Sequence, residues 1–261
     1  MTGIHMSQSI VFIHGIGLGA WIFEPYFKPW YEAQGFKVHC VNLPGHFPEV
    51  TDTEKQSITL DSCVAYVEQY LRTHVSASQT ASPYVLVGMS MGGAICQRLL
   101  AQGFVDDALR GVVLLSPVPP QHNLTFSLRL FRRLAESNTD VLIDFFRGII
   151  HRKLMFAPAS LSHMSDSEVV HYLDKMLSGF ARLEHEIFFS DLLSERISLP
   201  CPIKIIGGED DLLFTPDVVH FTAAFYRQSA EILSGLGHLI PFETNYQKGL
   251  DAIDRFIAEV M

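Results

Sequence analysis

Six short apolar runs, separated by longer segments with helical spacing, constrain the fold of this 261-residue chain most. The runs show little alternation of polar and apolar positions, as expected of strands that are covered on both faces. They are Ile10–Ile13, Lys37–Asn42, Tyr84–Gly88, Gly111–Leu115, Ile203–Gly207 and Glu231–Leu233. Strands that alternate with helices predict an α/β fold, with a mostly parallel sheet of about six strands flanked by helices.

Three of the intervening segments carry helix signals. Glu24–Gln34 is followed by Gly35, and Gly92–Gln102 is followed by Gly103. Glycine is a common residue just after the end of a helix. Thr59–His74 repeats apolar side chains every three or four residues, which is the spacing of one helix face. We therefore predict a helix over each of the three segments.

The alternation stops between Pro117 and about Leu199, where we find no convincing strand. Four stretches in this region have helical spacing. They are Phe126–Ala135, Asp140–Ile150, Asp166–Leu177 and Phe180–Leu193. We expect residues 1–117 and 198–261 to form the sheet-containing core, and residues 118–197 to form a helical cap inserted after the fourth strand.

The charge balance argues against a nucleic-acid partner. The chain has 19 Lys and Arg against 28 Asp and Glu, a formal net charge of −9, and no basic cluster, whereas a phosphate backbone requires clustered cations. No apolar run reaches the ~18–20 residues that span a bilayer, and the N-terminus lacks the charged region and cleavage site of a signal peptide. We expect a cytoplasmic protein without a membrane span, and its oligomeric state stays open.

Twelve histidines and four cysteines raise the question of a metal site. The histidines show no HExxH or comparable ligand spacing, and none of the cysteines forms a CxxC pair. Scattered cysteines without a signal peptide are typical of reduced core residues. We therefore predict no metal site and no cofactor.

The strongest local signal is Gly88-Met89-Ser90-Met91-Gly92, in which a predicted strand ends and a predicted helix begins. A serine on such a turn lies at the carboxyl edge of the sheet, where ligands bind in α/β proteins. Small flanking residues permit a strained turn that exposes the hydroxyl. The helix N-terminus behind it offers free N–H groups to a developing anion. We predict that Ser90 is a nucleophile.

This strand–turn–helix motif resembles that of the α/β-hydrolase superfamily, in particular its serine esterases and lipases with a helical cap. In that family the acid follows the serine in the chain, and the histidine comes last. Gly208-Glu209-Asp210-Asp211 follows a strand and precedes Pro216, which resembles the family's GxxD…P pattern and implies Asp211 as the acid, with Asp210 as the second choice. Gly237-His238 follows the last strand, and the resemblance implies His238 as the base.

The first strand leads into His14-Gly15-Ile16-Gly17, which resembles the family's HGxG loop. The resemblance implies an oxyanion hole formed by the backbone N–H groups of Ile16 and Met91. It implies that His14 orients this loop and does not transfer protons. Trp21 either lines the substrate pocket or belongs to the core, and we assign it to substrate binding.

These residues together predict a cofactor-free serine hydrolase that forms an acyl-enzyme on Ser90. The predicted cap is rich in Phe and Met, and such side chains commonly line apolar pockets, although many of them must also pack the cap against the core. We therefore expect the partner to be a small-molecule carboxylic ester of small to medium apolar groups.

Other activities remain open on the same triad: carbon–carbon bond hydrolysis, acyl transfer, perhydrolysis, or a non-catalytic ligand receptor. The early first strand and the Gly19-Ala20-Trp21 opening also resemble plant methylesterases and hydroxynitrile lyases. In many of those lyases a lysine follows the catalytic histidine, whereas Leu239 follows His238 here. This difference favours an esterase over a lyase.

Overall fold

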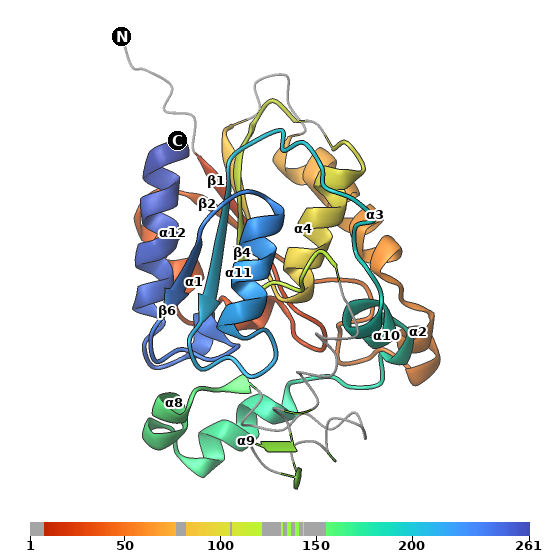
Figure 1. The fold of residues 1–261 in the computed structure, drawn as a ribbon, viewed down its shortest axis with the longest axis vertical. Coiled ribbons are helices and arrows are strands. Elements are labelled where there is room, and N and C mark those ends of the chain that lie inside the picture. The colour runs from red at the N-terminus through yellow and green to blue at the C-terminus, as the bar shows by residue number, and fades with distance from the viewer. Residues whose placement is uncertain are drawn as a thin grey trace.

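A computed structural model describes residues 8–76, 82–104, 106–121 and 155–261, together with positions 132, 135, 136, 139, 140 and 143. Within them, six strands form a parallel sheet (Figure 1). The strands are β1 (Ser9–Ile13), β2 (Lys37–Val41), β3 (Tyr84–Met89), β4 (Leu109–Leu115), β5 (Ile203–Gly208) and β6 (Ala230–Leu233). Each predicted strand matches one of these to within two residues, so the predicted sheet is confirmed.

The strand order is β2-β1-β3-β4-β5-β6, so the chain first builds outward from β1 to β2 and then crosses back to β3. The register pairs Ile13 of β1 with Gly88 of β3. The point where the direction of winding reverses is therefore the gap between β1 and β3. Loops that leave the carboxyl ends of two such strands diverge and form a crevice, which is where open α/β sheets bind ligands.

Helices cover both faces of the sheet. The helices of the described residues, not all of which lie on these faces, are η1 (Ala20–Ile22), α1 (Phe27–Ala33), α2 (Asp52–Ser57), α3 (Leu60–Tyr70), η2 (Leu71–Val75), α4 (Met91–Ala101), α8 (Pro158–His163), α9 (Asp166–Asp174), α10 (Ala181–Phe189), α11 (Pro216–Phe225), η3 (Ile240–Phe242) and α12 (Gln247–Val260). Alternate residues of β1 divide between the two faces. Ile10 and Phe12 pack with α1 and α12, while Val11 and Ile13 pack with α3, α4 and α11 (Figure 1). Burial on both faces explains the continuous apolar runs in the sequence.

The helix ends follow from local chemistry. Thr59 caps α3 by accepting a hydrogen bond from the Ser62 N–H, which satisfies one of the free donors of the first turn. Gly35 and Gly103 follow α1 and α4 with φ of +88° and +77°, a backbone region that glycine adopts without steric cost. The three predicted helices are thus observed, although α1 begins at Phe27, three residues later than predicted.

The inserted segment between β4 and β5 is described at residues 116–121 and 155–202. Its described helices are α8, α9 and α10, and this described part contains no strand. The prediction over Asp166–Leu177 matches α9, and that over Phe180–Leu193 matches α10, which ends earlier at Phe189. We did not predict α8. The predicted helices over Phe126–Ala135 and Asp140–Ile150 lie outside the described residues, apart from isolated positions.

The described part of the inserted segment buries its apolar side chains against the core. Phe180, Leu183 and Ile187 join the core on the α3 and α4 face, and Phe156 and Met176 join the core on the opposite face. These aromatic and Met side chains therefore serve packing, one of the two roles considered for them. In Figure 1 the helices α8 and α9 lie beyond one end of the sheet.

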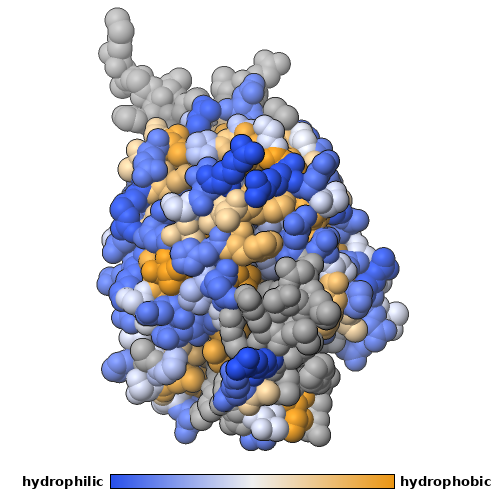
Figure 2. All heavy atoms as spheres, in the orientation of Figure 1, coloured by the Kyte–Doolittle hydropathy of each residue, from blue (hydrophilic) through white to orange (hydrophobic). Residues whose placement is uncertain are grey.

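Hydrophilic side chains cover much of the outer surface in Figure 2, between smaller apolar patches. In the part of the chain that the structure describes, every helix is too short or too polar to cross a lipid bilayer.

Candidate active site

Ser90 occupies a strained turn between β3 and α4. Its φ of 55° and ψ of −117° lie outside the regions that non-glycine residues ordinarily adopt. The Ser90 N–H donates to the carbonyl of Leu115 at 3.0 Å, and the Ser90 carbonyl accepts from Gly93 N–H at 2.9 Å. Strain of this kind costs of order 1–3 kcal/mol and persists only where the surroundings enforce it. The turn predicted from the sequence is therefore observed, with the serine at its apex.

Glycines let the backbone approach this turn closely. A Cβ on Gly92 would lie 2.1 Å from the carbonyl oxygen of Ile13, and one on Gly88 would lie 2.3 Å from the carbonyl oxygen of Gly92. On the opposite side, a Cβ on Gly15 would lie 2.9 Å from the Cβ of Ser90. The glycines of the motif therefore bring the end of β1 and the start of α4 against the serine turn.

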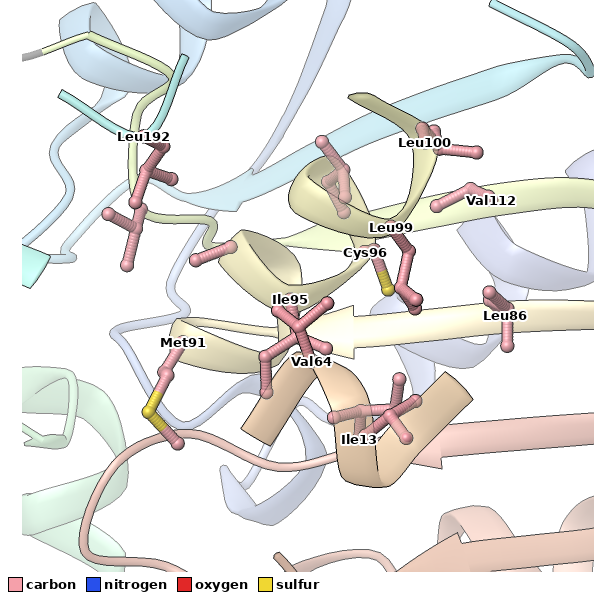
Figure 3. Close-up of a cluster of buried hydrophobic side chains, with 14 of the residues drawn as sticks. Ile13, Val64, Leu86, Met91, Ile95, Cys96, Leu99, Leu100, Val112 and Leu192 are labelled. Carbon is pink, nitrogen blue, oxygen red and sulfur yellow. The ribbon is translucent and has the colours of Figure 1, made fainter. Parts of the chain in front are cut away.

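Helix α4 is held firmly behind the serine. Its side chains belong to a buried apolar cluster that joins α4 to β3, α3 and β4 (Figure 3). The labelled members are Ile13, Val64, Leu86, Met91, Ile95, Cys96, Leu99, Leu100, Val112 and Leu192. Burial of these side chains against the sheet fixes the N-terminus of α4, and with it the Met91 N–H.

Asp211 and His238 form a buried pair at the same edge of the sheet. Asp211 follows β5 and His238 follows β6, and they are 1% and 3% exposed. The His238 Nδ1–H donates to Asp211 Oδ2 at 2.9 Å. The other oxygen, Asp211 Oδ1, accepts from the N–H groups of Leu213 and Phe214 at 2.8 and 3.0 Å. This arrangement places the proton on Nδ1 and leaves Nε2 as the acceptor.

Asp210, the second choice for the acid, makes no side-chain hydrogen bond to His238; its backbone N–H donates to Leu236 instead. Burial, and then Glu209, raises the pKa of Asp210. The geometry thus favours Asp211. After β4 the chain carries Ser116 and no carboxylate, and the Ser116 hydroxyl is buried without a hydrogen-bond partner among the described residues.

Ser90 is 5% exposed and shares the sheet edge with this pair. Within the described residues, no hydrogen bond joins Ser90 Oγ to His238. Hydrogen bonds between catalytic groups are often long in the absence of substrate and tighten only in the reacting complex. The structure therefore brings Asp211 and His238 into contact and places Ser90 at the same edge.

The loop after β1 and the start of α4 carry the two predicted oxyanion donors. In the described part of the chain, neither the Ile16 N–H nor the Met91 N–H donates a hydrogen bond. A turn from the Leu18 N–H to the Gly15 carbonyl, 3.3 Å, shapes this loop. The two predicted oxyanion donors thus lie in the loop after β1 and at the first residue of α4.

His14 stabilises the same loop as a neutral side chain. Its Nδ1–H donates to the Gly15 carbonyl at 2.8 Å, and its Nε2 accepts from the Leu43 N–H at 3.1 Å. Burial, with a smaller contribution from His46, lowers the pKa of His14 to about 3. A neutral histidine that is bonded at both nitrogens suits the expected role of loop support.

His46 packs between His14 and the inserted segment. Its ring lies 5.0 Å from that of His14 and stacks at 4.4 Å on Phe180. The His46 Nδ1–H donates to the Pro44 carbonyl, and burial lowers the pKa of His46 to about 4. Two neutral histidines, His14 and His46, therefore pack against each other next to the loop after β1.

These depressed pKa values predict a loss of stability in acid. Below pH 6.5 the unfolded chain protonates both histidines, while the folded chain keeps them neutral down to about pH 4. Unfolding then takes up protons, so the free energy of unfolding falls by about 1.4 kcal/mol per pH unit for each proton. Urea titrations between pH 7 and pH 4 should show that His46→Phe reduces this slope by about one proton. An identical slope in the two proteins would contradict the assignment.

Trp21 lies where the core meets the inserted segment. Its ring packs edge-on against Phe242 at 5.9 Å, and the Lys175 Nζ of the inserted segment lies 5.6 Å from its centroid. The neighbouring Ala20 N–H donates to Asn42 Oδ1 at 2.7 Å and anchors η1. Trp21 is thus half-buried beside η3, which follows His238.

Sequence reasoning missed Glu243, a carboxylate 1% exposed to solvent. It accepts hydrogen bonds from the loop of His238 and from the inserted segment. Its only signal in the sequence is its place five residues after His238, in a polar run that otherwise suggests a surface loop.

Metal-ligating side chains do not cluster in the described residues, where no group of three or more His, Cys, Asp or Glu could hold an ion.

Comparisons with known proteins agree with this architecture. A family model described as "Alpha/beta hydrolase family" matches residues 10–251. A sequence search of curated proteins finds no match.

Solved structures give strong matches at low identity. A thermophilic esterase from Thermogutta terrifontis is 18% identical with a TM-score of 0.71, covering 98% of this chain and 91% of its own. A bromoperoxidase from Bacillus anthracis is 21% identical with a TM-score of 0.72, covering 97% and 92%. An extracellular α/β-hydrolase from a Paenibacillus species, described as homologous to tobacco salicylic acid binding protein 2, is 13% identical with a TM-score of 0.63, covering 95% and 98%. At these identities the matches establish the fold alone.

Proposed function

The chain belongs to the alpha/beta hydrolase family, and on that premise we propose that it is a serine hydrolase that cleaves carboxylic esters of small to medium apolar groups. The proposal rests above all on one observation. A buried Asp211–His238 hydrogen bond presents an imidazole, whose Nε2 makes no hydrogen bond within the described residues, at the sheet edge where the strained Ser90 turn lies. This is the constellation of a base, its orienting acid and a nucleophile that acyl transfer requires.

In the proposed reaction, His238 Nε2 removes the proton from Ser90 Oγ as the oxygen attacks the ester carbonyl. The N–H groups of Ile16 and Met91 stabilise the tetrahedral oxyanion. His238 then protonates the leaving alcohol, and the acyl group remains on Ser90. A water molecule, activated by the same imidazole, releases the acid and restores the serine. Asp211 stabilises the imidazolium in both halves of the reaction.

No metal or organic cofactor enters this scheme, because the nucleophile, the proton carrier and the anion site are all protein groups. The cap, proposed to comprise residues 118–197 over a core of residues 1–117 and 198–261, would supply the walls of the substrate site. The fold names no substrate, since one fold supports many chemistries. Ester cleavage is preferred over hydroxynitrile cleavage because the apolar Leu239 follows His238, where many hydroxynitrile lyases have a lysine.

A substrate panel tests the proposal against its alternatives. The panel contains p-nitrophenyl esters of increasing chain length, a vinylogous diketone for carbon–carbon cleavage, a cyanohydrin for lyase activity, and acetate with peroxide for perhydrolysis. We expect turnover of the esters at least ten times faster than of the other compounds. Preferred turnover of another compound would assign the site to that reaction, and turnover of none would favour a ligand receptor.

Trp21 is proposed to contact the substrate. The variant Trp21→Ala should therefore change the preference for acyl-chain length. Loss of an aromatic wall should lower kcat/KM for a hexanoyl ester by about tenfold or more, since a buried apolar side chain contributes about 1.5–3 kcal/mol. The acetyl ester should change little. Trp30→Ala is the matched control, because Trp30 is exposed and bonds to Asp254. Equal chain-length profiles in the two variants would remove Trp21 from the substrate site.

A further inference from the structure

We propose that Glu243 is a positioning residue that fastens the loop carrying His238 to the inserted segment, so that the placement of the segment and of the proposed base are coupled. The effect of this coupling on catalysis rests on the proposed hydrolase function. The contacts that produce the coupling do not depend on that function.

Glu243 accepts hydrogen bonds from the loop of His238 and from the inserted segment. On the histidine side, the Gly237 N–H donates to its Oε1 at 2.8 Å. On the side of the inserted segment, the Ala157 N–H lies 3.0 and 3.1 Å from the two oxygens, and Ser160 Oγ–H donates to Oε2. Every partner is a donor, which matches an ionised carboxylate, since that group can only accept. Burial raises the pKa of Glu243, and these hydrogen bonds oppose the rise.

The residues before and after His238 are both held by hydrogen bonds of their backbone N–H groups. Gly237 bonds to Glu243, and the Leu239 N–H donates to the Met155 carbonyl at 3.0 Å. A Cβ on Gly237 would lie 2.6 Å from the Ala157 nitrogen, so the loop and the inserted segment approach within backbone contact. The His238 backbone therefore has little freedom that is independent of residues 155–157.

Ser160 extends the connection. Its hydroxyl donates to Glu243 and accepts from the Thr244 N–H at 3.0 Å. The side chain is fully buried at the start of α8. One polar pair therefore links the first described helix of the inserted segment to the two residues that follow η3.

A second attachment joins the inserted segment to the loop after β1. The Leu177 N–H donates to the Gly17 carbonyl at 2.8 Å. A Cβ on Gly17 would lie 2.3 Å from the Leu177 carbonyl oxygen. The inserted segment thus contacts both the proposed oxyanion loop and the histidine loop, which is the arrangement expected if its position controls the alignment of the two.

The test compares Glu243→Ala, Glu243→Gln and Ser160→Ala, with Glu259→Gln, at an exposed position of α12, as the control. Three quantities are measured in each folded protein: the thermal midpoint, kcat and KM for a p-nitrophenyl ester, and the low-field proton resonance of the His238 Nδ1–H bonded to Asp211. The resonance reports the histidine geometry directly. It remains informative if the protein hydrolyses no ester, so that failure of the proposed function is distinguishable from failure of the coupling.

We expect Glu243→Ala to lower kcat by about 100-fold, the scale of a misplacement of about 1 Å, and to broaden or remove the resonance. Glu243→Gln keeps an acceptor for Gly237 and should restore the resonance and most of kcat. A purely structural role would lower the thermal midpoint and leave the resonance and kcat unchanged, and that result would overturn the proposal.

Ser160→Ala decides the question if Glu243→Ala does not fold. It removes one hydrogen bond to the carboxylate, and we expect a loss in kcat of about tenfold together with a shifted resonance. A Ser160→Ala protein with the resonance and kcat of the wild type would also overturn the proposal.

Discussion

Ser90→Ala is expected to lower kcat for a p-nitrophenyl ester by about 10⁶-fold, the scale measured when the serine of a protease triad is removed. The reason is that the hydroxyl forms the bond that carries the acyl group, and no neighbouring side chain can replace it. The rate should be followed at saturating substrate, with the protein's thermal midpoint recorded in parallel. Removing the hydroxyl should leave the fold intact, because the backbone hydrogen bonds of the turn do not involve Oγ.

Ser57→Ala is the matched control. Ser57 is exposed at the end of α2, and within the described residues its hydroxyl bonds only to the Glu54 carbonyl, so the variant should keep the full rate. A Ser90→Ala, His238→Ala double variant should be no slower than Ser90→Ala alone, because residues that act as one unit are not additive. Hydrolysis by Ser90→Ala at the rate of the control would mean that another nucleophile performs the reaction.

Gly92→Ala should destabilise the protein by about 3 kcal/mol or more. The added methyl group would lie 2.1 Å from the Ile13 carbonyl oxygen, and both groups belong to backbone that is packed in the sheet core. Overpacking of a rigid site typically costs 1–3 kcal/mol and occasionally more. The measurement is the free energy of unfolding from urea titration.

Gly103→Ala separates this clash from a general cost of replacing glycine. Gly103 has φ of +77°, and nothing lies within 4 Å of a Cβ there, so the substitution should cost only about 1–2 kcal/mol of backbone strain. If both variants lost the same stability, the close approach of β1 to the serine turn would not be what excludes a side chain at Gly92.

Much of the fold could be predicted because its signals are local. Ile10 and Phe12 face one layer of helices while Val11 and Ile13 face the other, and a strand covered on both faces must be apolar at every position. The helices of the inserted segment were harder to predict, because each buries only part of its surface and so shows a weaker apolar pattern. Helix α8, six residues that begin at Pro158, is too short to show a helical repeat.

In the candidate site, too, some residues could be predicted from the sequence and one could not. Ser90, Asp211 and His238 each follow a strand, so the sheet brings their loops to one edge, and the resemblance to the family's chain order suggests the group. Glu243 carries no comparable signal. Its partners, Ala157 and Ser160, are more than 80 residues away in the chain, and such a contact arises only from the folded arrangement of the inserted segment.

The central claim is that Ser90 is an activated nucleophile, and fluorophosphonate labelling tests it most directly. The purified protein is treated with the probe, digested, and analysed by mass spectrometry. We predict a single adduct on the peptide that contains Ser90, formed rapidly in the wild type and lost in His238→Ala. An intact protein that takes up no label, or that is labelled at another residue, would contradict the account.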